Sequence, residues 1–354
     1  MIDISHIEYD EYELSLTTPV KTSRETLYSR HGYIIKLYSG DGKYGIGDIS
    51  PVSSFGAEDI DSVRDKLEEI QKVPSKLSPF EATPRSIYKN LTYLSDYPAT
   101  RTGLEQACID IASKIKKKTI PEFLMLDYSK NVRVNGLISM IPPADTQHKA
   151  RELIDQGYQT IKLKIGRTNF EEDIRCIEAV RSVSEKVAIR LDVNGNWSIE
   201  HTPEYLEQLS AYNIEYVEEP VTENDLHRIA ELRKNSPIKI ALDESAQSFD
   251  DVVRIIHRNA ADVIIVKPVV CGGILSSIRI MHTAHEYNLD VVITSAFESA
   301  VGRSAVVMLA ATQSGITHGL DTARYFTNDV VSDPFPVTDG SIVIDNAEQF
   351  SIDL

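Results

Sequence analysis

Residues 160–193 read TIKLKIGRTNFEEDIRCIEAVRSVSEKVAIRLDV, and this stretch decides the fold. A short β-branched run at Thr160–Ile165 is followed by an amphipathic stretch, and a second such run follows at Val187–Val193. The pattern predicts a strand, a helix and a second strand parallel to the first. A charged residue stands at or near the end of each run, Lys164 in the first and Asp192 in the second.

The same unit recurs along the second half of the chain, about every 25 residues, which is the length of one strand-plus-helix unit. Eight short and similar units, with about seven helices between them, favour a closed barrel over an open sheet. The strand-like runs are Val132–Ile138, Thr160–Ile165, Val187–Val193, Ile214–Glu218, Ile238–Leu242, Asp262–Val266, Asp290–Thr294 and, more weakly, Thr317–Leu320.

The N-terminal part follows another pattern. Ile2–Leu16 and Gly32–Tyr38 alternate with a period of two, and Ser39-Gly40-Asp41-Gly42 is a hairpin turn signal. Strands followed by helices predict an α+β unit. We therefore expect a capping domain at 1–125, a barrel at 126–332, and a strand-like tail at 333–354 that completes the cap. The helical patterns of the cap lie at Ala57–Ile70, Thr83–Leu91 and Ala99–Lys116.

Composition excludes several classes of function. The 354 residues carry a formal net charge of −16 and no long basic stripe, so nucleic acid is not an expected partner. Cys108, Cys176 and Cys271 lie far apart, which fits a reducing cytoplasm and neither a disulfide framework nor a zinc site. The N-terminus lacks the pattern of a signal peptide, and no apolar run is long enough to span a membrane. We expect a cytoplasmic protein.

Five charged residues fall at the carboxyl ends of successive strands: Lys164, Asp192, Glu218, Asp243 and Lys267. In barrels of this kind the active site lies at those ends. Three carboxylates there form an oxygen-rich site that suits Mg²⁺, and a lysine stands on either side of them. A metal-bound carboxylate substrate between two amines is well placed to lose the proton next to its carboxylate.

Lys162 and Lys164 share one face of their strand because they are two residues apart. Ile161, Leu163 and Ile165 share the other face, which must be apolar where a barrel strand packs on helices. The lysines are therefore expected to point into the barrel, where desolvation and a neighbouring cation lower the pKa of an amine. The alternative is an exposed edge strand with two surface lysines, which the surrounding barrel pattern disfavours.

The acidic strand ends also have structural alternatives. Asp192-Val193-Asn194-Gly195 by itself is typical of an Asx turn, and the pairs Glu218-Glu219 and Asp243-Glu244 are each typical of helix N-caps. Three such ends on successive strands favour a shared function. Asn194 projects with Asp192 and is a candidate ligand contact. No HExxH motif occurs, and Ser295 lacks a GxSxG context, so neither a zinc protease nor a serine nucleophile is predicted.

The order Lys-x-Lys, Asp, Glu, Asp and Lys on successive strands resembles the enolase superfamily, muconate-lactonizing subgroup. Residues 44–51, YGIGDISP, are similar to the cap loop of o-succinylbenzoate synthases, although the following Ser53-Ser54-Phe55-Gly56 departs from their Pro-Gly. Val134–Ile138, Ser295–Gly302 and His318–Thr322 resemble their first barrel strand, seventh-strand loop and eighth-strand end. The resemblance covers essentially the whole chain. It implies a modified (β/α)₇β barrel of the TIM type with an α+β N-terminal capping domain.

The resemblance also implies roles for individual residues. Asp192, Glu218 and Asp243 are expected to bind Mg²⁺, with Mn²⁺ as a substitute. Lys164 is expected to act as the base, Lys162 to stabilise the enediolate, and Lys267 to remain cationic on the opposite face. The expected substrate contacts are Asn194, Ser295 and Gly319, and the loops at Thr18–Arg24 and Ile49–Gly56 are expected to read the substrate tail, with Arg24 and Ser54 as candidates.

The activity implied is that of o-succinylbenzoate synthase, a hydro-lyase of menaquinone biosynthesis. It performs the syn dehydration of 2-succinyl-6-hydroxy-2,4-cyclohexadiene-1-carboxylate via an enediolate. N-succinylamino acid racemase, which uses the same two lysines, is an alternative. Dipeptide epimerases typically carry Asp-x-Asp after the eighth strand, where this chain has Asp321-Thr322-Ala323. The cap loop disfavours muconate cycloisomerase.

A metal-binding barrel without turnover is disfavoured because both base positions are lysine. The expected partner is a small-molecule carboxylate, and a homo-oligomer is compatible with the sequence.

Overall fold

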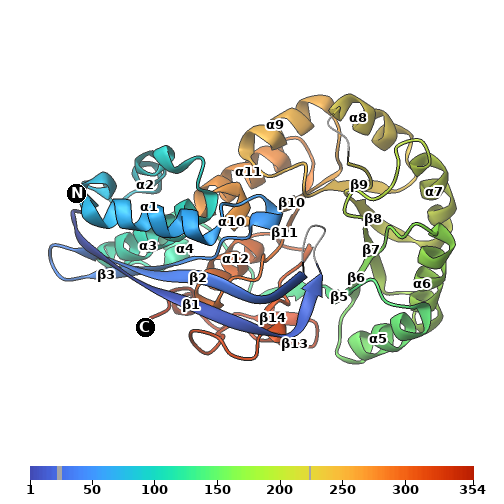
Figure 1. Ribbon diagram of the computed structural model, residues 1–354, viewed down its shortest axis with the longest axis horizontal. Coiled ribbons are helices and arrows are strands. Elements are labelled where there is room, and N and C mark those ends of the chain that lie inside the picture. Colours follow the sequence, from blue (N-terminus) through green and yellow to red (C-terminus); the bar gives the residue numbers. More distant parts are fainter. Residues whose placement is uncertain (22–25, 223–224) are drawn as a thin grey trace.

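The computed structural model describes residues 1–21, 26–222 and 225–354, so the candidate Arg24 lies outside the described residues. Figure 1 shows an N-terminal sheet with its helices beside a curved parallel sheet that is wrapped by helices. This arrangement is the predicted one, a TIM-type barrel with an α+β cap. No helix in the described ranges is long and apolar enough to cross a membrane.

The cap is built on a three-stranded antiparallel sheet in which β2 is central. Gly45 and Gly47 on β3 allow helix α3 to pack unusually closely, since a Cβ at Gly47 would lie 1.9 Å from the Gly103 carbonyl oxygen. Its elements are β1 (Ile4–Lys21), β2 (Thr26–Ser39), β3 (Tyr44–Ile49), α1 (Ile60–Lys72), α2 (Pro84–Asn90), α3 (Pro98–Lys116) and α4 (Ile120–Leu124), with 3₁₀ turns at Ser53–Phe55, Pro74–Leu77 and Thr92–Leu94.

The barrel is a seven-stranded parallel sheet that runs in chain order from β5 to β11. Helices cover its outer face (Figure 1). The strands are β5 (Gly136–Ile138), β6 (Thr160–Lys164), β7 (Ala188–Asp192), β8 (Ile214–Glu218), β9 (Lys239–Leu242), β10 (Val263–Val266) and β11 (Asp290–Ile293). The helices are α5 (Pro143–Asp155), α6 (Phe170–Val183), α7 (Thr202–Leu209), α8 (Leu226–Asn235), α9 (Phe249–Arg258), α10 (Pro268–Cys271), α11 (Ile274–Glu286) and α12 (Ala300–Ala311), and a 3₁₀ turn lies at Ser210–Tyr212.

The eighth strand closes the ring. β12 (Thr317–His318) pairs in parallel with β4 (Asn131–Val134), while a bridge between Thr294 and Gly319 joins it to the end of β11. The predicted strand Val132–Ile138 is therefore divided at Asn135, whose amide donates to the His318 carbonyl at 2.9 Å. Its first half pairs with β12 and its second half with β6.

The C-terminal tail joins both parts of the molecule. Strand β14 (Ser341–Val343) pairs antiparallel with β4 and with β13 (Val337–Thr338). Further along, the Ser351 hydroxyl donates to Asp110 Oδ1 of the cap helix α3 at 2.7 Å. Short 3₁₀ turns lie at Ala323–Tyr325 and Ala347–Phe350.

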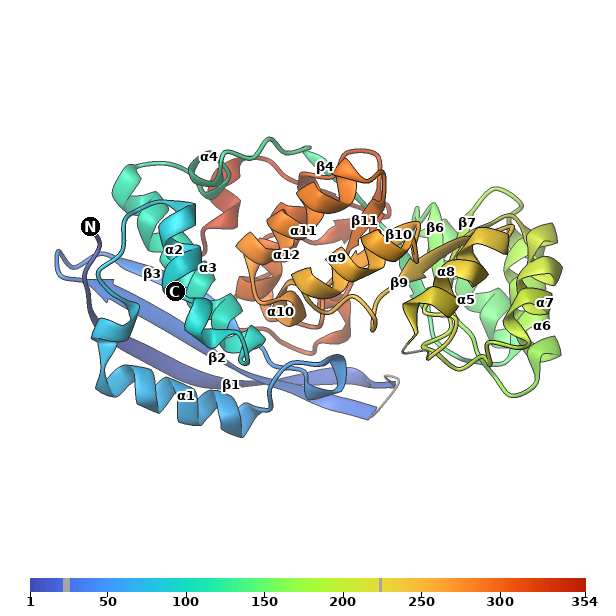
Figure 2. The same ribbon diagram turned by 90° about the horizontal axis from the view of Figure 1, so that it is seen from above.

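Helix α3 connects the cap to the barrel. Figure 2 shows it between the cap strands and the barrel helices, of which α10 and α11 contact it. Most of its residues are buried, because one side packs on β3 and another on α10 and α11. The cap is therefore held against the part of the barrel that follows Lys267.

Candidate active site

A cavity of about 110 Å³ lies at the carboxyl ends of the barrel strands. Its wall includes the three predicted catalytic lysines, two of the three predicted metal ligands and three of the predicted substrate contacts, whereas the third metal ligand, Glu218, is fully buried. The predicted residues that line it are Lys162, Lys164, Asp192, Asn194, Asp243, Lys267, Ser295 and Gly319. Strand register explains why they meet, since Lys164 is opposite Asp192, and Asp192 is opposite Glu218, in the parallel ladders.

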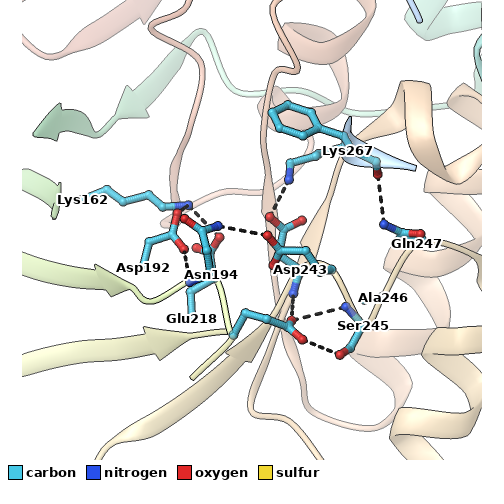
Figure 3. Close-up of polar contacts among 12 residues, drawn as sticks. Lys162, Asp192, Asn194, Glu218, Asp243, Ser245, Ala246, Gln247 and Lys267 are labelled. Carbon is cyan, nitrogen blue, oxygen red and sulfur yellow. Dashed lines mark hydrogen bonds and ion pairs between the residues drawn. The ribbon is translucent and has the colours of Figure 1, made fainter. Parts of the chain in front are cut away.

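Alternation along β6 directs two lysines into the cavity. Ile161, Leu163 and Ile165 are buried in the core, while the side chains of Lys162 and Lys164 are 15% and 20% exposed. Lys162 Nζ lies 2.6 Å from Glu218 Oε1 and 3.1 Å from Asp192 Oδ2. These contacts set Lys162 between two of the three predicted metal ligands (Figure 3).

The other two lysines flank the acids. Lys164 Nζ donates to Asn194 Oδ1 at 3.0 Å and lies 3.8 Å from Asp192 Oδ2. Lys267 Nζ forms a short ion pair with Asp243 and lies 4.5 Å from the centre of the Phe55 ring. Figure 3 shows Lys267 directed toward Asp243, away from the pair formed by Asp192 and Glu218.

The pKa of Lys162 differs from the sequence expectation, whereas that of Lys267 does not. Burial acts to lower the pKa of Lys162, but Asp192 and Glu218 outweigh it, so the pKa lies well above the ordinary value. Burial likewise acts to lower the pKa of Lys267, and Asp243 and Glu244 raise it above the ordinary value. The lowering expected for Lys162 is therefore wrong, because nearby carboxylates contribute more than desolvation. The raised pKa of Lys267 agrees with the expectation that this lysine remains cationic.

The same lysines and the burial of the site also shift the pKa values of the acids. Burial acts to raise the pKa of Asp192, but Lys162 and Lys164 hold it below the ordinary range. Burial raises the pKa of Glu218 to about 8, although Lys162 acts to lower it. Buried carboxylates are costly to ionise without cations beside them, and Lys162 and Lys267 supply those cations here.

The three carboxylates suit a hard divalent cation. Among residues 1–21, 26–222 and 225–354, however, no three acidic, histidine or cysteine side chains lie close enough together to hold one. Lys162 pairs with both Asp192 and Glu218, and Lys267 pairs with Asp243. Glu218 Oε2 is nevertheless buried without a hydrogen-bond partner in the described part of the chain. A buried, unpartnered carboxylate oxygen beside two further carboxylates fits the donor set that Mg²⁺ prefers.

Glu219 and Glu218 face different ways, as strand alternation predicts. Glu219 Oε2 accepts from the backbone amide of Asp243 at 2.9 Å, and Glu219 Oε1 accepts a short hydrogen bond from the Ser245 hydroxyl. Burial raises the pKa of Glu219 to about 7, with Glu244 adding to the shift. Glu219 therefore stabilises the turn after β9, while Glu218 pairs with Lys162.

The three predicted substrate contacts have structural partners of their own. Asn194 bridges Lys164 and Glu244, since its Nδ2 donates to Glu244 Oε1 at 2.9 Å. The Ser295 hydroxyl lies 2.5 Å from Glu298 Oε2 and its amide donates to the Gly319 carbonyl at 2.9 Å. Each of the three still borders the cavity.

Sequence reasoning missed the apolar wall of the cavity. Phe55 and Phe297 border it, as do Val20, Leu137 and Tyr325. Phe55 lies in the cap loop flagged by the sequence, whereas the candidate Ser54 is buried and does not line this cavity. Phe297 has a φ of 64°, a left-handed conformation that its sequence gives no reason to expect.

Asp321 also borders the cavity but is already engaged. Its Oδ2 accepts from the Tyr158 hydroxyl at 2.5 Å and from Arg324 Nη1 at 2.9 Å. A carboxylate paired with a guanidinium attracts a substrate ammonium less strongly than a free carboxylate does.

A parallel barrel whose strand ends carry three acids between lysines, closed by an α+β cap, defines an enolase-type barrel protein. Residues 145–349 match the family model described as "Enolase C-terminal domain-like", which is more than half of the chain. The chain therefore belongs to the enolase superfamily.

Individual relatives carry different activities. An N-succinyl-L-Arg/Lys racemase of Bacillus cereus is 31% identical over 66% of this chain and 64% of its own length. An o-succinylbenzoate synthase of Desulfotalea psychrophila is 28% identical over 92% of this chain and 95% of its own. The solved dipeptide epimerase of Enterococcus faecalis, complexed with Mg and the dipeptide L-Leu-L-Tyr, superposes with a TM-score of 0.87 over 98% and 99% of the two chains, at 22% identity. That last similarity concerns the fold alone.

Proposed function

We propose that this protein is a Mg²⁺-dependent o-succinylbenzoate synthase, a hydro-lyase acting on 2-succinyl-6-hydroxy-2,4-cyclohexadiene-1-carboxylate. The observation that carries the proposal is the cavity in which Lys164 and Lys267 flank the acids Asp192 and Asp243, with Glu218 beneath. The similarity to the Desulfotalea psychrophila synthase over most of both chains supports the choice of reaction.

The side chains then have distinct tasks. Lys164 removes the proton next to the ring carboxylate. The resulting ammonium returns that proton to the departing hydroxyl on the same face, so the C–O bond breaks, water leaves and the ring becomes aromatic. Lys162 donates to the substrate carboxylate as negative charge accumulates there. Lys267 stabilises the charge from the opposite face and stays protonated, in keeping with its raised pKa.

Asp192, Glu218 and Asp243 would hold Mg²⁺, which when bound supplies positive charge to the substrate carboxylate. Lys162 and Lys267 pair with these acids here. Lys164 Nζ lies 3.8 Å from Asp192 Oδ2 and is the amine that would take the substrate proton. Asn194, bonded to Lys164 and to Glu244, keeps that amine directed into the cavity.

The same site also suits N-succinylamino acid racemase, which is the second candidate. The 31% identity to the Bacillus cereus racemase favours it, as does the presence of an amine on each face of the cavity. Dipeptide epimerase is less well supported. Asp321 is neutralised by Arg324, and Ala323 stands where a second acid would bind an ammonium group.

A substrate comparison tests the proposal. Purified protein with Mg²⁺ is given the cyclohexadiene carboxylate, a set of N-succinyl amino acids, or L-Ala-L-Glu, and kcat/KM is measured for each. The proposal expects dehydration to have the highest kcat/KM. A higher value for exchange of the α-proton of an N-succinyl amino acid would favour the racemase, and one for the dipeptide would favour the epimerase.

A further inference from the structure

The two flanking lysines are held by different parts of the molecule. Lys164 lies on β6 and contacts Asn194 and Asp192, which are both barrel residues. Lys267 pairs with Asp243 of the barrel but also lies against the ring of Phe55 from the cap. A displacement of the cap would therefore change a contact of Lys267 and leave these contacts of Lys164 in place.

The cap also forms a hydrogen bond with the backbone that follows Lys267. The Thr102 hydroxyl of helix α3 lies 2.7 Å from the Pro98 carbonyl and 3.2 Å from the carbonyl of Pro268, the residue after Lys267. The Lys267 carbonyl itself accepts from the amides of Val270 and Cys271, both at 2.9 Å. The short helix α10 thus links the position of Lys267 to its contact with the cap.

One turn further along α3, Glu105 extends into the same segment. Glu105 is fully buried, and its Oε2 accepts from the amide of Leu275 at 2.8 Å, in the first turn of α11. The partial positive charge of that helix end favours the carboxylate. Glu105 Oε1 has no hydrogen-bond partner within the described residues, so this acid is retained at a cost to stability.

The segment between Pro268 and Leu275 is shaped to receive Glu105. Gly272 has a φ of 78° and Gly273 a φ of 116°, both unfavourable for other residues. A Cβ at Gly273 would lie 2.4 Å from Glu105 Oε2, so any side chain there would displace the carboxylate. Gly273 therefore serves a contact with the cap as well as a tight turn.

We infer that Glu105, together with Thr102, is a positioning residue for Lys267. Through these two residues, the placement of the capping domain on the barrel controls the position of Lys267. The position of Lys164 is set by barrel residues. Neither Glu105 nor Thr102 lines the cavity. The inference rests on the proposed function for its catalytic meaning, because only a paired-lysine mechanism makes the placement of Lys267 matter to turnover. The claim that Glu105 and Thr102 position Lys267 does not depend on any substrate.

Selective labelling of the two lysines tests the inference. The full-length protein is reductively dimethylated with formaldehyde and a borane, and the rates at Lys267 and Lys164 are measured by mass spectrometry. The side chains are 13% and 20% exposed, so each serves as a reference for the other. Loosening of the α10 segment should make Glu105→Ala raise the Lys267-to-Lys164 rate ratio by about threefold to tenfold.

Three further variants separate positioning from general damage. Glu105→Gln keeps an oxygen acceptor for the Leu275 amide and should retain the wild-type ratio. Ser113→Ala removes another hydroxyl-to-backbone bond of α3, at 2.8 Å to the Asp110 carbonyl, and should leave the ratio within about twofold. Thr102→Val should raise the ratio in the same direction as Glu105→Ala, and it decides the matter if Glu105→Ala does not fold.

Two results would overturn the inference. In the first, Glu105→Ala and Thr102→Val give the same ratio as Ser113→Ala. In the second, both lysines are labelled faster by the same factor. A parallel assay of wild-type dehydration and α-proton exchange keeps the two proposals apart, because an inactive wild type would refute the proposed function and leave the labelling ratio to decide the role of Glu105.

Discussion

Gly273→Ala should destabilise the protein far more than an ordinary glycine substitution. Gly273 has a φ of 116° and a ψ of 180°, a conformation in which a residue with a side chain costs about 1–3 kcal/mol. The new Cβ would also lie 2.4 Å from Glu105 Oε2. Displacing that buried carboxylate from the Leu275 amide costs about 1–3 kcal/mol more.

The two contributions together predict a loss of about 2–6 kcal/mol in the free energy of unfolding. At about 2 °C per kcal/mol for a chain of this size, the thermal midpoint should fall by about 4–12 °C. Differential scanning calorimetry of the purified variants measures this shift. Gly42→Ala is the matched control, because Gly42 has a φ of 82° and a Cβ added there would meet nothing within 4 Å, so this variant should lose only about 1–2 kcal/mol.

A double-mutant cycle isolates the contact. In a Glu105→Ala background the second contribution disappears, so Gly273→Ala should then cost about as much as Gly42→Ala. The reasoning is refuted if Gly273→Ala costs no more than Gly42→Ala in the wild type. It is equally refuted if the Glu105→Ala background leaves the cost of Gly273→Ala unchanged.

Three further outcomes are expected. Lys164→Ala should reduce kcat by about 10³-fold or more, as expected for loss of a general base, with Mg²⁺ affinity by calorimetry and the thermal midpoint near wild type; near-normal kcat would remove Lys164 from that role. Asp243→Asn should weaken Mg²⁺ binding by about tenfold or more, and an unchanged binding isotherm would exclude Asp243 as a ligand. Burial raises the pKa of Asp48 to about 6, so its proton binds more tightly in the folded protein and stability should fall as the pH rises from about 4 to 7. Asp48→Asn should remove about 3 kcal/mol of that fall, and denaturation curves with the same pH slope in both proteins would contradict the assignment.

The order of the barrel strands was predictable from one sequence because each strand is a short β-branched run ended by a polar turn. The runs predicted to end at Ile165, Glu218 and Val266 match the observed strand ends to within one residue. Because the carboxyl ends of parallel strands meet at one edge, this topology places the predicted lysines and acids close together. The alternation on β6 likewise separated Lys162 and Lys164 from the core.

Contacts between the cap and the barrel were not predictable from that sequence. Glu105 meets Leu275 across 170 positions of the chain, and Phe55 meets Lys267 through a loop with no repeating pattern. The break at Asn135 was missed because β4 and β5 pair with different strands while their residues form one continuous run. The raised pKa of Lys162 and Lys267 depends on distances to acids that no spacing rule supplies.

The most direct test of the proposed function is the loss of ultraviolet absorbance of 2-succinyl-6-hydroxy-2,4-cyclohexadiene-1-carboxylate, followed with Mg²⁺ and with EDTA. The wild-type protein should dehydrate this compound rapidly with Mg²⁺ and stop when EDTA removes the metal, while Lys164→Ala should be inactive under both conditions. Absence of dehydration by a folded, Mg²⁺-loaded wild type, alongside α-proton exchange on N-succinyl amino acids or L-Ala-L-Glu, would contradict the proposed reaction.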